Sequence, residues 1–139
     1  MPIEDLARSD VVTASPDDSV DHLAATMDEE GVGSVVITNG DTPVGIVTDR
    51  DLAIRVLAEG LDTESLTAAD VMSEGLATIE RGAGFYQATN LMSEHGVRRL
   101  PVCEGDTLVG IITSDDITEL IADEEQQLAD IIRAQRPPY

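Results

Sequence analysis

Two seven-residue segments, GIVTDRD and GIITSDD, carry the side chains best suited to chemistry. In each, a threonine precedes an aspartate by three residues after a β-branched run, giving the pairs Thr48 with Asp51 and Thr113 with Asp116. A carboxylate held at a helix start can accept hydrogen bonds from two neighbouring hydroxyls, such as those of a ribose, and the threonine adds a donor and an acceptor. The same spacing is that of a capping box, which only fixes a helix start. The residues alone leave both interpretations open.

Both segments belong to a tandem repeat that spans the chain. Shifting the sequence so that residue 40 meets residue 105 superposes GDTPVGIVT on GDTLVGIIT without a gap. Self-similarity at a fixed period is the signature of repeated structural units. We therefore predict four segments: a first unit at 1–60, a linker at 61–66, a second unit at 67–125, and a helical extension with its tail at 126–139.

Each unit is expected to fold in the order β-α-β-β-α, which is an α+β arrangement. A short helical lead-in at 3–8 or 67–72 precedes a short apolar segment and then a helix. The apolar face of that helix is formed by Val20, Leu23, Ala24 and Met27 in the first unit and by Phe85, Ala88 and Met92 in the second. Gly31 and Gly96 are expected to end these helices, because glycine tolerates a positive φ.

Two β-branched strands follow the helix in each unit. They are expected at 34–38, 44–48, 100–103 and 108–113. The sequence Asn39-Gly40-Asp41 between the first two is a hairpin signal. A closing helix then begins at Asp49 in the first unit and near Ser114 in the second. Because a unit of this size is marginal alone, the two should pack over a shared core.

The last helix is predicted to run on past Asp123. Its apolar positions continue through Leu128, Ile131 and Ile132 until Pro137 stops the helix. An extension with one apolar stripe needs a surface to cover, which we expect to be either the other repeat or a second subunit.

The charge of the chain is extreme. It has 28 acidic residues against 8 basic ones, all of them arginine, and a formal net charge of −20. A polyanion gains nothing from counterion release at phosphates, so nucleic acids and anionic membranes are disfavoured as partners. Only three aromatic residues are present, too few for a base-stacking platform. Because molar salt screens charge repulsion within roughly 3 Å, the composition favours a halophilic, archaeal-like protein over an ordinary acidic one.

Other features predict a folded, soluble, cytoplasmic protein. The hydrophobic fraction of 42% argues against disorder. The single cysteine, Cys103, excludes an internal disulfide, fits a reducing compartment and is expected in the core. The sequence has no run of about 18 apolar residues and no signal-peptide pattern. It also lacks a phosphate loop, a nucleophile elbow and zinc-ligand spacing, so neither a metal site nor a catalytic residue is predicted.

The duplicated GIVTDRD and GIITSDD segments, together with HGVRRLPV at 95–102, resemble the CBS domain, named after cystathionine β-synthase. The chain is similar to a tandem pair of these domains, a Bateman module, over nearly all of residues 1–125. The resemblance implies two repeats packed about a pseudo-twofold axis, with adenosine-containing ligands bound in clefts between them. It also implies a homodimer.

The resemblance assigns expected roles to residues of both repeats. Ribose hydroxyls would be held by Thr48, Asp51, Thr113 and Asp116. The adenine pocket would be lined by Ile46, Ile111, Val32, Gly33, Val97, Val12 and Ala77, the residues facing each isoleucine coming from the other repeat. Phosphates would meet Arg98 and Arg99 in the second cleft and Arg50 in the first. The alternative for Arg98 and Arg99 is pairing with surface carboxylates, worth about 0–1 kcal/mol for each pair.

The implied function is a regulatory module without catalysis that binds AMP, ATP, NAD or S-adenosylmethionine, with Mg²⁺ accompanying a phosphate-bearing ligand. The module would signal to an unidentified protein by a shift in conformation or self-association. One alternative is a ligand-free dimerisation scaffold. Another is an enzyme acting on a nucleotide, for which the sequence offers no nucleophile or general base. His95 is expected as a helix-end cation rather than as a base.

Overall fold

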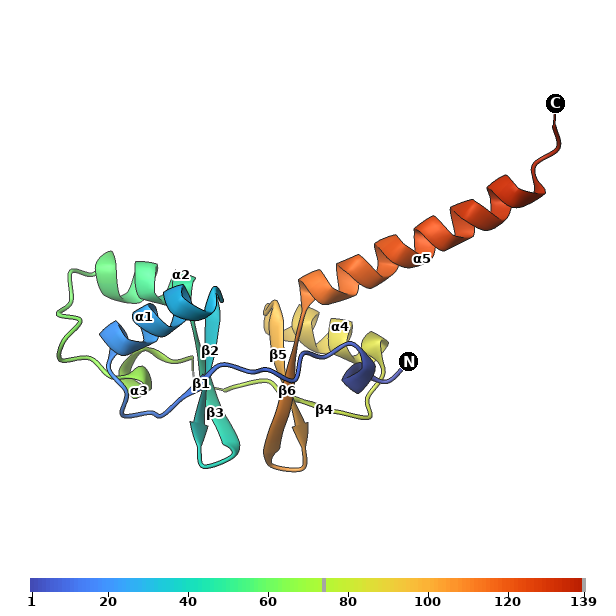
Figure 1. Cartoon of the computed structure of the whole chain (residues 1–139). Helices are drawn as coiled ribbons and strands as arrows, with labels where there is room; N and C mark the ends of the chain where they lie inside the picture. Colours follow the sequence, from blue (N-terminus) through green and yellow to red (C-terminus); the bar gives the residue numbers. More distant parts are fainter. Residues whose placement is uncertain (74, 139) are drawn as a thin grey trace.

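The computed structural model describes residues 1–73 and 75–138, which form two halves lying side by side (Figure 1). The first half contains β1 (Thr13–Ala14), α1 (Val20–Glu30), β2 (Ser34–Asn39), β3 (Thr42–Thr48), α2 (Asp49–Asp51) and η2 (Leu52–Leu57). The second half contains β4 (Ile79–Glu80), α4 (Phe85–His95), β5 (Arg99–Glu104), β6 (Thr107–Thr113) and α5 (Ser114–Gln135). Two lead-in helices, η1 (Ile3–Asp5) and α3 (Ala68–Val71), precede β1 and β4. The predicted α+β class and element order are confirmed.

The two sheets have the same topology. β1 pairs parallel with β2, which pairs antiparallel with β3, and β4, β5 and β6 repeat this order. The register shifts once within each antiparallel pair, at equivalent positions of β2 and β5. At the tip of the first hairpin Gly40 has a φ of 64°, a left-handed conformation that glycine adopts without steric cost. The hairpin predicted at Asn39-Gly40-Asp41 is thus confirmed.

The helix faces differ from the prediction at two positions. In α1, Val20, Leu23 and Met27 are buried, but Ala24 is exposed. In α4, Phe85 is 40% exposed. Each helix buries only a narrow stripe, so a residue beside the stripe or in the first turn keeps contact with solvent. Gly31 and Gly96 end the two helices with φ values of 65° and 63°, as predicted.

The lead-in helices are exchanged between the two halves. Ile3, from η1, is fully buried in the core of the second half, where its backbone N–H donates to the carbonyl of Ala83 at 2.7 Å. Ala68 and Val71, from α3, are buried in the core of the first half. Each folded half therefore takes its lead-in from the other sequence repeat, which the repeat pattern did not predict.

The segments after the lead-ins cross the strands of the opposite half. Arg8 and Ile111 exchange backbone hydrogen bonds of 2.9 Å in both directions, and Ser73 donates to the carbonyl of Ile46 at 3.3 Å. Since Arg8 is equivalent to Ser73 and Ile111 to Ile46 in the repeat, the two crossings are related by a pseudo-twofold axis. A Cβ on Gly110 would lie 2.9 Å from the carbonyl oxygen of Arg8, so this strand glycine marks a close backbone approach.

The closing helix of the first half starts at Asp49, as predicted, but changes its winding. After one turn as α2 it continues as the π-helical segment η2, in which Ala58 donates to the carbonyl of Ala53 at 2.9 Å. Wider winding rotates the following side chains away from the positions that a regular helix gives them. Val56 is buried, whereas Leu57 is 70% exposed.

Helix α5 extends away from the body of the molecule (Figure 1). Near its start Ile117 is buried, but Leu128, Ile131 and Ile132 are 60%, 55% and 62% exposed. The continuous helix confirms the predicted extension, and these exposures exclude the other repeat as the surface that its stripe covers. Within residues 1–73 and 75–138, no helix combines the length and apolarity needed to cross a membrane.

Candidate functional site

The two Thr-x-x-Asp turns form capping boxes, as the structural interpretation predicted. Asp51 Oδ2 accepts a hydrogen bond from the backbone N–H of Thr48 at 2.9 Å, and Thr48 Oγ1 accepts from the backbone N–H of Asp51 at 3.1 Å. The turn from Thr113 to Asp116 has the same two bonds, at 2.9 and 3.2 Å. Each cap uses one carboxylate oxygen, so it does not exclude a ligand at the other.

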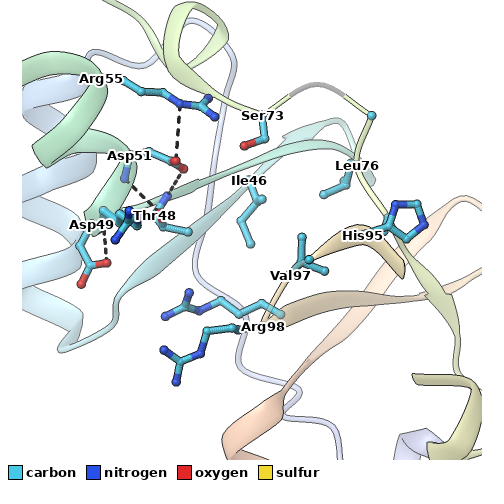
Figure 2. A pocket seen from close by; sticks show the side chains of 15 residues that line it. Ile46, Thr48, Asp49, Asp51, Arg55, Ser73, Leu76, His95, Val97 and Arg98 are labelled. Atoms are coloured by element: carbon cyan, nitrogen blue, oxygen red, sulfur yellow. Dashed lines mark hydrogen bonds and ion pairs between the residues drawn. The ribbon is translucent and has the colours of Figure 1, made fainter. Parts of the chain in front are cut away.

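The carboxylate of Asp51 lines a cavity, and its second oxygen accepts no hydrogen bond from the described residues. Its nearest charged neighbour is Arg55, whose Nε lies 3.7 Å from Asp51 Oδ1, too far for a hydrogen bond. Figure 2 shows the carboxylate between Arg55 and Thr48, at the edge of this cavity. Asp51 can therefore still accept hydrogen bonds from a ligand.

This first cavity, defined by Thr48 and Asp51, has a volume of about 770 Å³. Its walls come from both repeats, with Ile46 on one side and Val97 on the other (Figure 2). Ala77, in the segment leading to β4, also lines it. Small-molecule pockets commonly measure roughly 300–1,000 Å³. The first cavity can therefore hold a nucleotide-sized ligand.

The first cavity concentrates positive charge in an acidic chain. Four of the eight arginines line it: Arg50, Arg55, Arg98 and Arg99. The carboxylates in its described lining are Asp49 and Asp51. His95, at the end of α4, adds an imidazole to the rim (Figure 2). The cavity is thus electrostatically suited to an anion although the chain as a whole repels one.

The second cavity, on the Thr113 turn, is smaller, with a volume of about 250 Å³. Its lining includes Ile111 and Thr113 from one repeat and Val12, Val32 and Gly33 from the other, as the resemblance implied. Asp116, however, is absent from the described lining of this cavity. The structure therefore brings the predicted residues together in both clefts but leaves the second aspartate covered.

The predicted phosphate-binding arginines do not divide as expected. Arg98 lines the first cavity together with Arg50, not the second, because the start of β5 faces the turn of the opposite repeat. Arg99 lines both cavities, and its Nη2 would lie 3.2 Å from a Cβ on Gly33. Arg98 also forms an ion pair of 3.3 Å with Asp115, in which both side chains are more than 70% exposed. Such a pair is worth about 0–1 kcal/mol, so a ligand could replace it.

Several residues that line these clefts were not predicted from the sequence, and three of them bear on ligand binding. Arg55 and Ser73 line the first cavity and Arg8 lines the second. The sequence contains a signal for Ser73 and Arg8, because they occupy equivalent positions of the repeat and one is a hydroxyl residue while the other is a cation. Arg55 lies one helical turn after Asp51, a spacing that brings side chains together.

The residues that the structure describes hold no group of three or more His, Cys, Asp or Glu side chains arranged to bind a metal ion.

A family model described as the CBS domain matches residues 3–58 and 68–123. Together with two matching folded halves and the clefts between them, this match shows that the chain belongs to the CBS domain family.

Two curated relatives illustrate the range of similar chains. An uncharacterized protein of Methanopyrus kandleri is 40% identical over 120 residues, which cover 85% of this chain but 61% of that protein. Hypoxic response protein 1 of Mycobacterium tuberculosis is 33% identical over 114 residues, covering 81% of this chain and 80% of that protein.

Solved structures share the fold. The structure of Hypoxic Response Protein I with two coordinated zinc ions has a TM-score of 0.78 at 32% identity, covering 86% of this chain and 98% of that chain. A second solved structure is that of the CBS domain pair of the protein MJ0100 in complex with 5-methylthioadenosine and S-adenosyl-L-methionine. It has a TM-score of 0.80 at 23% identity, covering 89% of this chain and 98% of that chain.

Proposed function

We propose that this protein is a regulatory module that binds an adenosine-containing ligand of the AMP, ATP, NAD or S-adenosylmethionine class in a cleft between its repeats. The observation that carries the proposal is the carboxylate of Asp51. One of its oxygens caps α2, the other lies 3.7 Å from Arg55 Nε without a hydrogen bond, and the residue lines a cavity of about 770 Å³.

The first cavity supplies a partner for each part of such a ligand. The ribose hydroxyls donate to the open oxygen of Asp51, beside the hydroxyl of Thr48. The base packs between Ile46 and Val97, while the backbone near Ala77 offers hydrogen-bonding groups to its edge. A phosphate or carboxylate tail faces the arginines of the cavity, with Mg²⁺ joining a polyphosphate.

A protein with the same fold has been solved with ligands of the proposed class. MJ0100, whose CBS pair superposes on this chain, was solved with two adenosyl compounds. That likeness establishes how the chain folds, so the assignment of a ligand rests on the residues of the first cavity.

The module acts, in this proposal, by shifting a population between arrangements of the repeats or subunits. A ligand can shift that equilibrium only by the difference of its affinities for the two states. A second copy of the chain is the proposed partner of the exposed stripe on α5. The segment 114–125 of α5 carries six carboxylates, whereas the last turns of the helix and Arg136 carry two arginines and one carboxylate. An antiparallel pair of α5 helices therefore places opposite charges together, while a parallel pair places acid beside acid.

The proposal is tested by thermal-shift titration in molar KCl with AMP, ATP, NAD and S-adenosylmethionine, each with and without Mg²⁺. One ligand should raise Tm in a saturable manner, since stabilisation reaches about 2.7 kcal/mol at a hundredfold excess over Kd. Asp51→Asn keeps an oxygen for the cap but replaces the open oxygen by an NH₂ donor. Because hydrogen bonds to a charged group contribute about 1.5–3 kcal/mol, the variant should weaken binding at least about tenfold.

The matched control is Asp70→Asn. Asp70 Oδ2 caps α3 in a similar way, accepting from the Thr67 backbone N–H at 2.9 Å, but it lines neither described cavity. This variant should leave ligand affinity unchanged. A flat response to all four ligands, or equal affinity in Asp51→Asn and the unmodified protein, would contradict the proposal and favour a ligand-free scaffold.

A further inference from the structure

The two clefts differ at one pair of equivalent positions that the repeat places at the same point of the fold. Arg8 and Ser73 each follow a lead-in helix, and each bonds through its backbone to the strand isoleucine of the opposite half, Ile111 or Ile46. The backbone geometry is therefore shared, whereas one side chain is a long cation and the other a short hydroxyl.

The long side chain of Arg8 reaches the aspartate of the second cleft. Its Nε and Nη2 donate to Asp116 Oδ1 at 3.2 and 3.0 Å. Asp116 Oδ2 accepts from the backbone N–H of Thr113 at 2.9 Å and from its Oγ1 at 3.0 Å. Both carboxylate oxygens are thus engaged inside the chain, and only 9% of the Asp116 side chain is exposed.

Asp51, the equivalent aspartate of the first cleft, has no hydrogen bond of this kind to its second oxygen from the residues that the structure describes, and 16% of its side chain is exposed. Ser73 lines the cavity and is too short to bridge to it, and Arg55 approaches no closer than 3.7 Å. The cavity volumes agree with this difference, at about 770 Å³ for the first cleft and about 250 Å³ for the second. Only the first falls within the range of roughly 300–1,000 Å³ that ligand pockets occupy.

We infer that Arg8 closes the second cleft to ribose, so that each chain binds one adenosine-containing ligand, in the first cleft. Arg8 is then the residue that determines which of the two duplicated sites is used. This inference rests on the proposed function and adds to it the stoichiometry and the identity of the occupied cleft.

The test is isothermal titration of the full chain with AMP, with ATP and with S-adenosylmethionine, before and after Arg8→Ser, which installs the residue that the first cleft has at this position. The unmodified protein should bind one equivalent per chain. Arg8→Ser should bind a second equivalent. Arg8→Gln, which removes the charge but keeps much of the side chain, gives an independent reading if Arg8→Ser folds poorly.

The matched control is Arg133→Ser. Arg133 is an exposed arginine with one carboxylate partner, Asp130 at 3.1 Å, and it lies far along α5 from both cavities. It should leave the stoichiometry at one. Asp51→Asn should weaken the single site of the unmodified protein at least about tenfold, and in the Arg8→Ser background it should leave the newly opened site unchanged.

Two results would overturn the inference while leaving the proposed function intact: two equivalents bound by the unmodified protein, or one equivalent in both Arg8 variants. A single site whose affinity is unchanged by Asp51→Asn would contradict both the inference and the proposed function. Absence of binding in every variant would also remove the proposed function itself, and the inference with it.

Discussion

At the scale of single residues, three aspartates cap helices by similar hydrogen bonds and yet differ in what they can do. Asp51, Asp70 and Asp116 each use Oδ2 to accept the N–H of a threonine three residues earlier. The difference lies in the rest of the carboxylate, which faces a cavity in Asp51, lies away from both described cavities in Asp70 and meets Arg8 in Asp116. A capping motif therefore becomes a candidate binding site only through the residues opposite its second oxygen.

Cys103 gives a prediction at the same scale. Burial raises the pKa of its thiol, and the charges of Glu80 and Asp106 add to the effect. Because the folded state favours the neutral thiol, this stabilisation is complete below the ordinary pKa of 9.0 and is lost as the pH rises through the higher native value. The free energy of unfolding should fall above pH 9.0 by at most about 1.4 kcal/mol per pH unit, measured by urea denaturation.

The chain has no lysine to titrate in the same range, but it has two tyrosines, whose phenols ordinarily titrate near pH 10, so a variant without the thiol is needed for comparison. Cys103→Ala is the control and should flatten the pH dependence. An equally steep decline in Cys103→Ala would assign the effect to other groups.

The motif and its two interpretations could be predicted from sequence at this scale. The choice among the three aspartates could not, because the partner of Asp116 lies 108 residues away. Nothing in local spacing predicts that Arg8 reaches it. Only the comparison of equivalent repeat positions, Arg8 with Ser73, contains that information.

At the scale of elements, the molecule depends on the two crossings that place Arg8 on β6 and Ser73 on β3. Glycines in these strands allow the approach. A Cβ on Gly45 would lie 2.5 Å from Met72 Sδ, and one on Gly110 would lie 2.9 Å from the backbone oxygen of Arg8. The first obstacle is the end of a flexible side chain, whereas the second is backbone that is itself hydrogen-bonded to β6.

Gly110→Ala should therefore destabilise the protein by about 1–3 kcal/mol, the usual cost of overpacking, as measured by urea denaturation. Gly82→Ala is the control, because a Cβ there meets nothing within 4 Å. That change should be neutral or stabilise by up to about 1 kcal/mol through the unfolded chain. Equal stability of the two variants would show that the crossing is not tightly packed.

Local patterns predicted most of the elements, since the hairpins and α5 depend on turn residues and apolar periodicity within each segment. Local patterns could not predict that the two halves exchange their lead-in helices. Periodicity shows that Ile3, Ala68 and Val71 need a core, but it does not distinguish between two cores of nearly the same sequence. The π-helical winding of η2 was missed for a related reason, because regular spacing was assumed throughout the helix.

At the scale of the whole molecule, the net charge of −20 opposes compactness, and the first cavity is a local exception to it. Added salt should screen both the repulsion among the carboxylates and the positive charge of the first cavity. Screening lengths fall from about 10 Å at 0.1 M salt to about 3 Å at 1 M. Repulsion among exposed carboxylates should thus decline steeply with KCl, which is the behaviour expected of a halophilic protein.

We predict that Tm rises by at least a few degrees between dilute buffer and molar KCl, followed by differential scanning calorimetry. Glucose at matched osmolality serves as the uncharged control and should give a smaller rise. A Tm independent of KCl would contradict the halophilic interpretation.

The exposed stripe of α5 gives a second prediction at this scale. Leu128→Gln combined with Ile132→Gln should convert a dimer to a monomer in light scattering after size exclusion, because both side chains are more than half exposed within one chain. Gln126→Ala, on the opposite face of the helix, should leave the mass unchanged. A monomeric unmodified protein, or a dimer insensitive to the double change, would contradict pairing through α5.

Helix α5 projects from the rest of the molecule and would pivot at its first turn, which carries Asp116. At 1.5 Å per residue, its 22 residues give an arm of about 33 Å. Tilting such an arm by about 10° would sweep its tip through about 6 Å, with the length set by helix geometry. A displacement of less than about 1 Å in the turn that Arg8 holds through Asp116 would therefore be magnified several times at the C-terminal end of α5, while the two halves of the molecule keep their structure.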